Sequence, residues 1–293
     1  MGIPINTLCY QCLLGKYIGI ARDLGDEKTA MAFSKALMTL LQTAEEDADS
    51  SILGQRINGL FWQYYGLGAD RFREEKRQSN LFVLERMEKL RSAVEAEADP
   101  VLAALQFSIL GNYIDFAALG KTVDLAVLDA MLDTARQIAI DPAVYAAFLA
   151  DLKQANSFLL LCDNAGEIGF DRLLAEQLQK AFPQLQITFC VRGAPIHNDA
   201  TREDAQLLQI PFPVIDSGCG IGGTVLRLVS PQCRSALEHA DVILAKGMGN
   251  TETMLGCKLP VYYAFLVKCP RFQQFFQKPH MTPMFIKESN QKA

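Results

Sequence analysis

Hydrophobic residues are spaced differently in the two halves of the chain. In the first half they recur at intervals of three and four residues, a pattern typical of amphipathic helices. The segments that show it are residues 8–24, 27–45, 52–65, 74–97 and 101–119. Strand-like alternation is scarce before residue 155. We therefore expect a helical region over residues 1–155.

Two Asp-Pro pairs mark expected helix starts. Asp99-Pro100 and Asp141-Pro142 place an N-capping residue before a proline at the first helical position. Proline is favoured there because its missing N–H removes no helical hydrogen bond. Each pair therefore predicts the amino end of a helix.

The second half of the chain alternates between strand and helix patterns. Short apolar runs at residues 157–162, 186–191, 213–216, 241–245 and 261–267 are typical of buried parallel strands. Helical patterns separate them at residues 168–182, 203–208, 224–229, 233–239 and 252–255. This alternation predicts an α/β fold, in which a parallel doubly wound sheet over residues 156–293 follows the helical N-terminal region. The polar tail after Pro279 is expected to be loosely held.

Polar or glycine-rich segments follow four of the expected strands. In open parallel sheets, ligands bind beyond the carboxyl ends of the strands. The segments at these ends are residues 163–167, 192–201, 217–223 and 246–250. Since all four reach the same edge of the sheet, they predict a functional site there.

Charge and composition narrow the class of protein. The chain has 293 residues and a formal net charge of −5, whereas binding a nucleic acid requires clustered Lys and Arg. No apolar run reaches the roughly 18 residues that span a bilayer, and the first residues lack a basic region followed by an apolar stretch. Eight cysteines in a chain of this length indicate thiols rather than a disulfide scaffold. We expect a cytoplasmic protein that binds neither nucleic acid nor membrane, of unknown oligomeric state.

Several motifs resemble those of one family, the damage-control phosphatases, once called domain of unknown function 89. These are DNAGE with FD at residues 163–171, NDATREDA at 198–205, AKGMGNTET at 245–253, GNYID at 111–115 and CYQC at 9–12. The likeness spans nearly the whole chain, and the early cysteine pair is similar to the microbial branch. It implies a helical region packed on an α/β domain and metal-dependent hydrolysis of phosphate monoesters. It also implies that Asp163, Asn164 and Asp199 hold the metal at the catalytic centre.

The chemistry of these three residues agrees with the resemblance. Two carboxylates and one amide oxygen form an all-oxygen set, which suits Mg²⁺ or Mn²⁺ better than softer metals. Co²⁺ and Ni²⁺ are further candidates. Three protein ligands would leave coordination positions open for water and for an oxygen of the substrate phosphate.

A phosphate-binding group is expected next to these ligands. Lys246 can meet the phosphate charge, and Gly247 lets backbone N–H groups approach closely. The helix that opens near Asn250 would point its positive end toward an anion. Glu167, four residues after Asp163 on a first helical turn, is expected to face the same site as a base or hydrogen-bond acceptor.

Simpler interpretations of the acidic residues stay open. Asp163 or Asn164 taken singly can cap a helix, and so can Asp199. Thr201 and Asp204 resemble a capping box. Taken as a set at one sheet edge, the first three residues favour a metal site.

A glycine-rich loop supports a rival enzyme class. Gly218, Gly220 and Gly223 fit the spacing of the dinucleotide-binding fingerprint, although they follow the third strand rather than the first. This keeps open a nucleotide- or S-adenosylmethionine-dependent transferase.

Three cysteines support a second rival. Cys9 and Cys12 share a helix face, and Cys269 follows the last strand near the same sheet edge. They are expected to gather either as buried thiols or as ligands of a softer metal such as Zn²⁺, with Lys268 lowering their pKa values. This keeps open a non-catalytic metabolite-binding protein.

The favoured prediction is a divalent-metal-dependent phosphatase. Its substrates would be phosphate monoesters of small metabolites, such as sugar phosphates, nucleotides or damaged phospho-cofactors. Asn112 and Asp115 are expected either to form a helix-borne wall of the substrate cleft or to bond buried backbone. The sequence does not say whether water or the Asp163 carboxylate attacks phosphorus.

Overall fold

Residues 2–45, 48–112 and 135–288 are described in the computed structural model. Asp115 and the far end of the helix expected over residues 101–119 lie outside these ranges.

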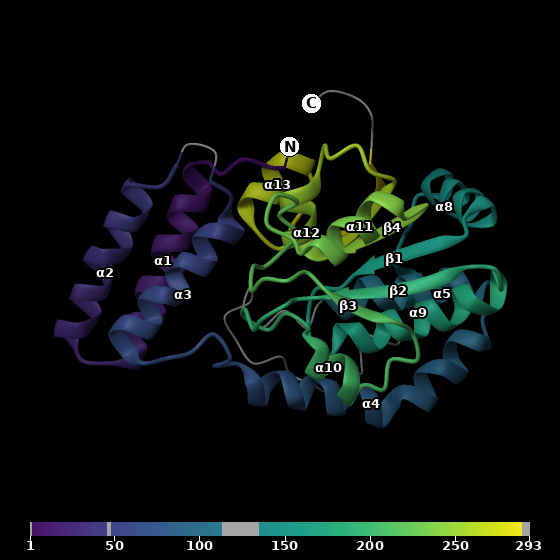
Figure 1. The fold of residues 1–293 in the computed structure, drawn as a ribbon, viewed down its shortest axis with the longest axis horizontal. Coiled ribbons are helices and arrows are strands. Elements are labelled where there is room, and N and C mark those ends of the chain that lie inside the picture. Colours follow the sequence, from purple (N-terminus) through teal and green to yellow (C-terminus); the bar gives the residue numbers. More distant parts are fainter. Residues whose placement is uncertain (1, 46–47, 113–134, 289–293) are drawn as a thin grey trace.

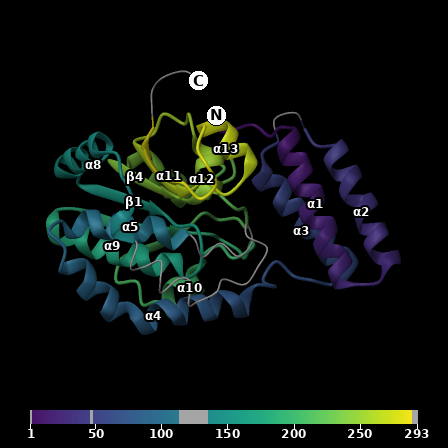
Figure 2. The same ribbon diagram turned by 180° about the vertical axis from the view of Figure 1, so that it is seen from behind.

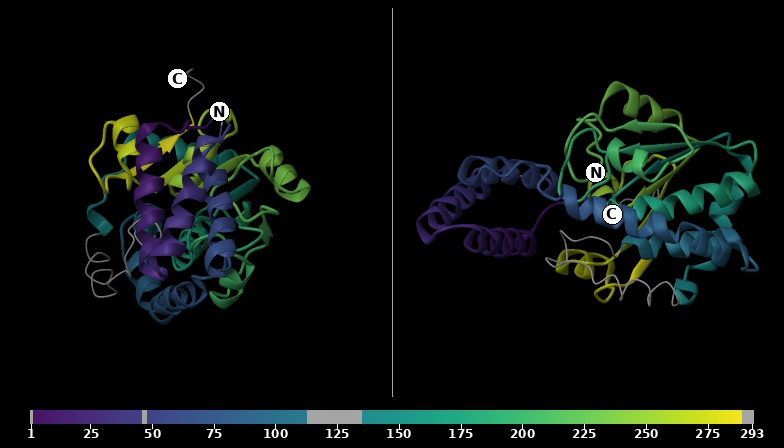
Figure 3. Two further views of the ribbon diagram at one scale, coloured as in Figure 1. Left: turned by 90° about the vertical axis from the view of Figure 1, so that its left-hand side faces the viewer. Right: turned by 90° about the horizontal axis from the view of Figure 1, so that it is seen from below.

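Three helices at the start of the chain form a layer of their own. They are α1 (Thr7–Leu24), α2 (Glu27–Gln42) and α3 (Ser50–Tyr65). Asn6, Asp26 and Asp49 cap their amino ends by accepting backbone hydrogen bonds, which satisfies N–H groups that have no partner in the first turn. The helices enclose a small core around the buried Phe33 and Phe61. We call α1–α3 the helical layer; it stands beside the rest of the molecule in Figures 1 and 3.

The remaining helices of the first half pack on the sheet. They are α4 (Arg73–Glu95), α5 (Pro100–Gly111), the short 3₁₀ helix η2 (Ala135–Gln137) and α8 (Pro142–Gln154). Asp99 and Asp141 cap α5 and α8, each followed by proline, as predicted. α5 is apolar on all sides because it is enclosed by neighbouring helices and the sheet.

A six-stranded sheet forms the centre of the described structure. Its strands are β1 (Ser157–Leu161), β2 (Gln186–Val191), β3 (Val214–Asp216), β4 (Val242–Lys246), β5 (Val261–Leu266) and β6 (Pro283–Lys287). Their order is β3-β2-β1-β4-β5-β6. β1 to β5 pair in parallel, and β6 runs antiparallel to β5. The order reverses between β1 and β4, so a ligand site is expected beyond the carboxyl ends of these two strands.

Helices cover both faces of the sheet (Figure 2). One face carries α4, α5, α8, α9 (Glu167–Ala181) and α10 (Arg202–Leu207), and the other carries α11 (Pro231–His239), α12 (Gly247–Met254) and α13 (Pro270–Phe276). Side chains alternate along β4: Val242 and Leu244 pack toward α5 and α9, whereas Ile243 and Ala245 pack toward α11 and α12. By the same alternation Lys246 points toward α5 and α9.

The structure differs from the sequence prediction at several places, including α13, which no predicted segment covers. Residues 224–229 form turns rather than a helix, because Thr224 bonds through its backbone N–H and its hydroxyl to α12. Within the tail after Pro279, residues 283–287 form β6, where Pro283 is tolerated at the first position of an edge strand; residues 289–293 lie outside the described ranges. The helix after β4 begins at Gly247, earlier than predicted.

The hydrophobic clusters bear on how the chain is organised. One cluster joins α4, α5 and α8 to the sheet and so includes residues on both sides of position 155. The domain boundary placed there stays a prediction. Among the described helices, none is both long and apolar enough to cross a membrane.

Candidate active site

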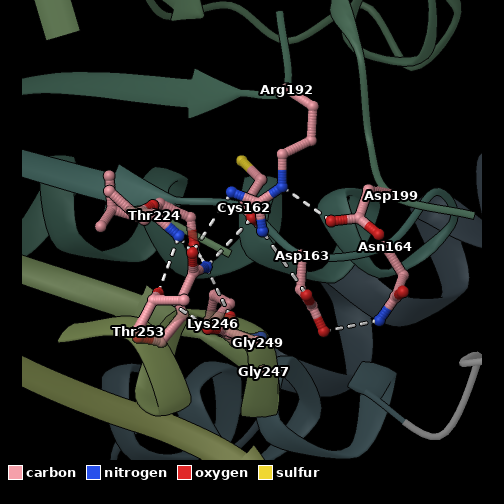
Figure 4. Close-up of polar contacts among 12 residues, drawn as sticks. Cys162, Asp163, Asn164, Arg192, Asp199, Thr224, Lys246, Gly247, Gly249 and Thr253 are labelled. Carbon is pink, nitrogen blue, oxygen red and sulfur yellow. Dashed lines mark hydrogen bonds and ion pairs between the residues drawn. The ribbon is translucent and has the colours of Figure 1, made fainter. Parts of the chain in front are cut away.

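Three sequence-predicted residues meet beyond the carboxyl ends of β1 and β2. Asp163 and Asn164 follow β1, and Asp199 lies in the loop after β2. Two backbone hydrogen bonds join these loops: the Ala200 N–H donates to the Asp163 carbonyl at 2.7 Å, and the Ala165 N–H donates to the Asn198 carbonyl at 2.9 Å. Between them Asn164 and Asp199 form an isolated antiparallel bridge. The main chain therefore fixes the relative position of the three side chains (Figure 4).

Helix capping does not explain these residues. The N-cap of α9 is Gly166, and no side chain caps that helix. The N-cap of α10 is Thr201, which forms the predicted capping box with Asp204. Asp163, Asn164 and Asp199 are thus left for another role.

Two amide groups hold the carboxylates in place. The Asn164 Nδ2 donates to Asp163 Oδ2 and to Glu167 Oε2, both at 2.8 Å. Asn112 Nδ2 donates to the same two oxygens at 2.9 Å, so Asn112 orients the site from the end of α5. Asn164 uses its side-chain nitrogen in both hydrogen bonds, and its side-chain oxygen Oδ1 accepts none from the described residues, so Oδ1 is available to a cation.

Arg192 links the two acidic loops. Its Nε donates to Asp199 Oδ2 at 2.7 Å, and its terminal Nη2 lies 3.8 Å from Asp163 Oδ1. The side chain is buried, with 2% exposed. Burial acts to lower its pKa, but Asp199 and Asp163 outweigh burial and raise it. The sequence placed Arg192 after the second strand without assigning it a role; its pairing with Asp199 depends on the loop conformation.

Lys246 corrects one prediction from the sequence. Its ammonium is fully buried and donates to Glu167 Oε1 at 2.7 Å, Asp171 Oδ1 at 2.8 Å and the Ser108 carbonyl at 2.7 Å. All three of its donors are used, so in this arrangement it does not meet a substrate phosphate. Lys246 instead neutralises carboxylates beneath the site, and these raise its pKa even though burial alone would lower it.

Asp171 completes this buried group. Burial raises its pKa to about 6, although Lys246 acts in the opposite direction. The Ser108 hydroxyl donates to Asp171 Oδ1, the oxygen that also accepts from Lys246, at 2.6 Å. Asp171 lies four residues after Glu167, on the same face of α9, and this spacing was the signal in the sequence that could have linked the two residues.

Glu167 and Asn250, the other residues expected beside the phosphate, lie beneath the site rather than on the cavity wall. Glu167 is fully buried and accepts hydrogen bonds from Asn112, Asn164 and Lys246, so it supports the site from below. Asn250 is fully buried too, and bonds Arg192 and the Lys246 carbonyl.

Gly247 has a steric role beside the first ligand. It has a φ of +79°, and a Cβ at this position would lie 1.8 Å from Asp163 Oδ2. Only glycine lets the backbone pass so close to this carboxylate.

A cavity of about 430 Å³ opens onto the three predicted ligands, a size typical of small-molecule sites. The helical layer forms its opposite wall, and the first turn of α12 forms one side. Its lining includes Tyr17, Ser50, Met248, Gly249, Glu252 and Lys268. Lys246, Glu167 and Asn250 do not line this cavity.

The three cysteines line the same cavity but do not form the predicted metal site. Cys9, Cys12 and Cys269 all contribute to its wall. Burial raises the pKa of Cys9 and raises that of Cys269 to about 11, so burial disfavours the thiolate form that a metal ligand needs at these two positions. Within the described ranges, no three His, Cys, Asp or Glu side chains are arranged to hold a metal ion. Their Cα separations stay a prediction.

The glycine-rich loop does not have the structure of a dinucleotide fingerprint. No helix opens at Gly223, since turns follow and α11 begins only at Pro231. Gly223 has a φ of +112°, and a Cβ there would lie 2.4 Å from the Gly249 carbonyl. The loop therefore packs against the start of α12.

The residues at the site fit a hard divalent cation. The side-chain oxygen of Asn164 is available to a cation, and the carboxylates of Asp163 and Asp199 line the same cavity. The proposed ligand set consists of two carboxylates and one amide oxygen. Such a site does not require three acidic or thiol side chains. Arg192 and Lys246 contact four buried carboxylates, namely Asp163, Glu167, Asp171 and Asp199, and Lys268 adds a further cation to the cavity wall.

Comparisons with known proteins identify relatives of this chain. The model of the damage-control phosphatase ARMT1-like domain matches residues 5–282. A protein of Methanocaldococcus jannaschii described as uncharacterized is 31% identical over 280 residues, covering 91% of this chain and 90% of that protein. A damage-control phosphatase of Archaeoglobus fulgidus is 30% identical over 273 residues, covering 91% and 93%.

A solved structure shows the same fold. The crystal structure of a DUF89 family protein from Pyrococcus horikoshii has a TM-score of 0.84 at 24% sequence identity, and the match covers 98% of this chain and 100% of that chain. Together with the family model and the sequence relatives, this shows that the chain belongs to the damage-control phosphatase ARMT1-like domain family.

Proposed function

We propose that this chain is a divalent-metal-dependent phosphatase that hydrolyses phosphate monoesters of small metabolites. One observation carries the proposal: backbone pairing between two loops brings Asp163, Asn164 and Asp199 together at the rim of a cavity of metabolite size. The family membership and the printed name of the Archaeoglobus relative support the same reaction class.

The three side chains would hold Mg²⁺ or Mn²⁺ through oxygen atoms. When bound, such an ion supplies Lewis-acid stabilisation of the charge on the phosphoryl oxygens. Arg192 keeps Asp199 oriented, and Asn112 with Glu167 keeps Asp163 and Asn164 oriented. Because these contacts hold the carboxylates and the amide in fixed orientations, the ligands would be pre-organised and need little rearrangement.

The first turn of α12 is the proposed phosphate-binding element. Met248 and Gly249 line the cavity next to the ligands, and the first N–H groups of a helix have no partner within it. α12 points its positive end toward this position. Lys268 adds a positive charge to the wall, held by its hydrogen bond to the Asn112 carbonyl.

The proposal is tested by Asp163→Asn and Asp199→Asn, which keep shape and remove one charge each. Outer-shell partners of a metal typically contribute about 10–100-fold to affinity or activity, so loss of a ligand is expected to exceed this. Calorimetric titration with Mn²⁺ and a screen over sugar phosphates, nucleotides and phospho-cofactors measure the two effects. Asp216→Asn is the matched control, because Asp216 ends β3 but pairs with Arg202 outside the cavity. Unchanged Mn²⁺ affinity in both ligand variants would contradict the proposed site.

The nucleophile needs a separate measurement. Single-turnover hydrolysis in ¹⁸O-labelled water places the label in phosphate if water attacks phosphorus directly. If the Asp163 carboxylate attacks first, an acyl phosphate forms, and its hydrolysis at carbon places the label in the Asp163 side chain. Hydrolysis of the acyl phosphate at phosphorus labels the phosphate, as direct attack by water does. Trapping of a phospho-enzyme separates these last two routes.

A further inference from the structure

Glu252 is an acidic residue of the cavity that the proposed metal site does not use. It lies on α12 and lines the same cavity as Asp163 and Asp199. Neighbouring residues of α12 are committed elsewhere, because Asn250 and Thr251 are fully buried and bond to the sheet and to the helix itself. Their burial fixes the orientation of α12, with Glu252 on the side that faces the cavity.

Its distance along the helix suits contact with the organic part of a phosphate ester. Met248 and Gly249 precede Glu252 by four and three residues and so share its helix face. At a rise of 1.5 Å per residue, Glu252 stands roughly 4.5–6 Å farther along the axis. This step is longer than the distance from phosphorus to the first carbon of an ester, but helical side chains lean toward the helix N-terminus, so the Glu252 side chain extends back toward Met248 and Gly249. A phosphate at the start of α12 would therefore place its bridging oxygen within reach of the Glu252 side chain.

The groups around Glu252 favour its neutral form. Desolvation by the surrounding protein raises the pKa of Glu252 to about 7; the hydrogen bond from Ser50 and the charge of Arg271 lower it, and the charge of Asp49 raises it. These groups come from the start of α3 and from α13, and Cys9 and Cys269 approach from α1 and α13. A carboxylic acid that titrates near neutral pH is well matched to proton transfer.

We propose that Glu252 is the general acid that protonates the leaving-group oxygen; this inference rests on the proposed phosphatase function. As the bond between phosphorus and the bridging oxygen breaks, the Glu252 carboxyl proton moves to that oxygen and the alcohol leaves neutral. Water supplies the hydroxyl group that phosphorus gains, and the second proton of that water restores the acid. The sum is phosphate monoester plus water to alcohol plus phosphate, with no other reactant.

The test compares two leaving groups in Glu252→Gln, which keeps the size of the side chain but has no acidic proton. Hydrolysis of the alkyl phosphate that the wild type cleaves fastest should fall about 10²-fold or more in kcat. Hydrolysis of p-nitrophenyl phosphate, whose leaving group needs no proton, should change less than about threefold. The wild-type kcat for the alkyl substrate should also fall as pH rises above the pKa of Glu252, and the variant should lack this alkaline limb.

Control measurements separate the possible failures. Glu203→Gln alters an exposed carboxylate paired with Arg73 and should match the wild type for both substrates. Mn²⁺ affinity and thermal unfolding of Glu252→Gln should be close to wild type, which excludes misfolding. Equal losses for both substrates, or no loss, would overturn the general-acid role. His197 also lines the cavity, so a selective loss in His197→Asn instead would assign the proton to His197. If the wild type hydrolyses neither ester, the phosphatase proposal itself fails.

Discussion

Replacing the buried lysine by methionine tests the structural role assigned to Lys246. Methionine has a similar volume, so Lys246→Met removes a charge and three donors while leaving little empty space. Glu167 and Asp171 then remain as buried carboxylates without their cation. Both carboxylates lie beneath the predicted ligands and do not line the cavity. The main effect of the change should therefore be a loss of folding stability.

The expected cost is large compared with the stability of a protein. Removing one partner of a buried ion pair costs about 3–5 kcal/mol, out of a total free energy of unfolding of about 5–15 kcal/mol. At about 2–4 °C per kcal/mol for a chain of this size, the melting temperature should fall by roughly 6–20 °C. Urea unfolding followed by far-ultraviolet circular dichroism measures the free energy, and a thermal scan measures the second quantity.

The cost should depend on pH with a definite sign. Burial raises the folded-state pKa of Asp171 to about 6 with the lysine present, and loss of Lys246 raises it further. When the pKa of a group is higher in the folded than in the unfolded protein, the group stabilises the folded state. This contribution is fully present at pH values below the unfolded pKa and is lost as pH rises through the folded pKa. The difference between variant and wild type should therefore be smaller at pH 5.5 than at pH 8.

A double variant provides the control for this experiment. Lys246→Met with Asp171→Asn removes one unpaired carboxylate, so it should recover part of the lost free energy at pH 8 and flatten the pH dependence. A cost below about 1 kcal/mol at pH 8 for the single variant, within the range of an exposed ion pair, would refute the buried-pair interpretation.

Two further predictions concern the predicted ligands. Gly247→Ala should lower both stability and Mn²⁺ affinity, because its methyl group would overlap Asp163 Oδ2 and the φ of +79° disfavours alanine; unchanged Mn²⁺ titration would contradict the crowding. Asn164→Asp replaces a donor to two carboxylates by a third acceptor, so we expect a loss of about 1–3 kcal/mol in unfolding free energy without metal. Mn²⁺ should restore more stability in this variant than in the wild type, and a smaller restoration would count against Asn164 as a ligand position.

Much of the fold was predictable from the sequence because each signal was local. Helix periodicity, Asp-Pro starts and apolar strand runs located most elements to within a few residues. The prediction failed where tertiary contacts decided the outcome. Thr224 gives its donors to α12 instead of to a helix of its own. Pro283 starts a strand only because β5 offers it an edge.

For the candidate site, the sequence predicted which strand ends carry the residues but not the directions of all their side chains. Strand ends placed Asp163, Asn164 and Asp199 at one edge, and the structure brings them together. The sequence did not show which way Lys246 points, because that depends on the alternation along β4 and on which face carries α5 and α9. It also did not show that Asp171, one helical turn beyond Glu167, would receive the same ammonium group.

The helical layer has a consequence for how such a protein can acquire new substrates. Its core around Phe33 and Phe61 is separate from the clusters that hold the sheet. Its inner surface, including Leu13 and Gly54, forms the cavity wall opposite the acidic loops. Substitutions on that surface can reshape the cavity while the loops after β1 and β2 keep their backbone pairing. The two sides of the cavity are thus encoded by different stretches of the chain, and the side formed by α1 and α3 can diverge while the loops after β1 and β2 are retained.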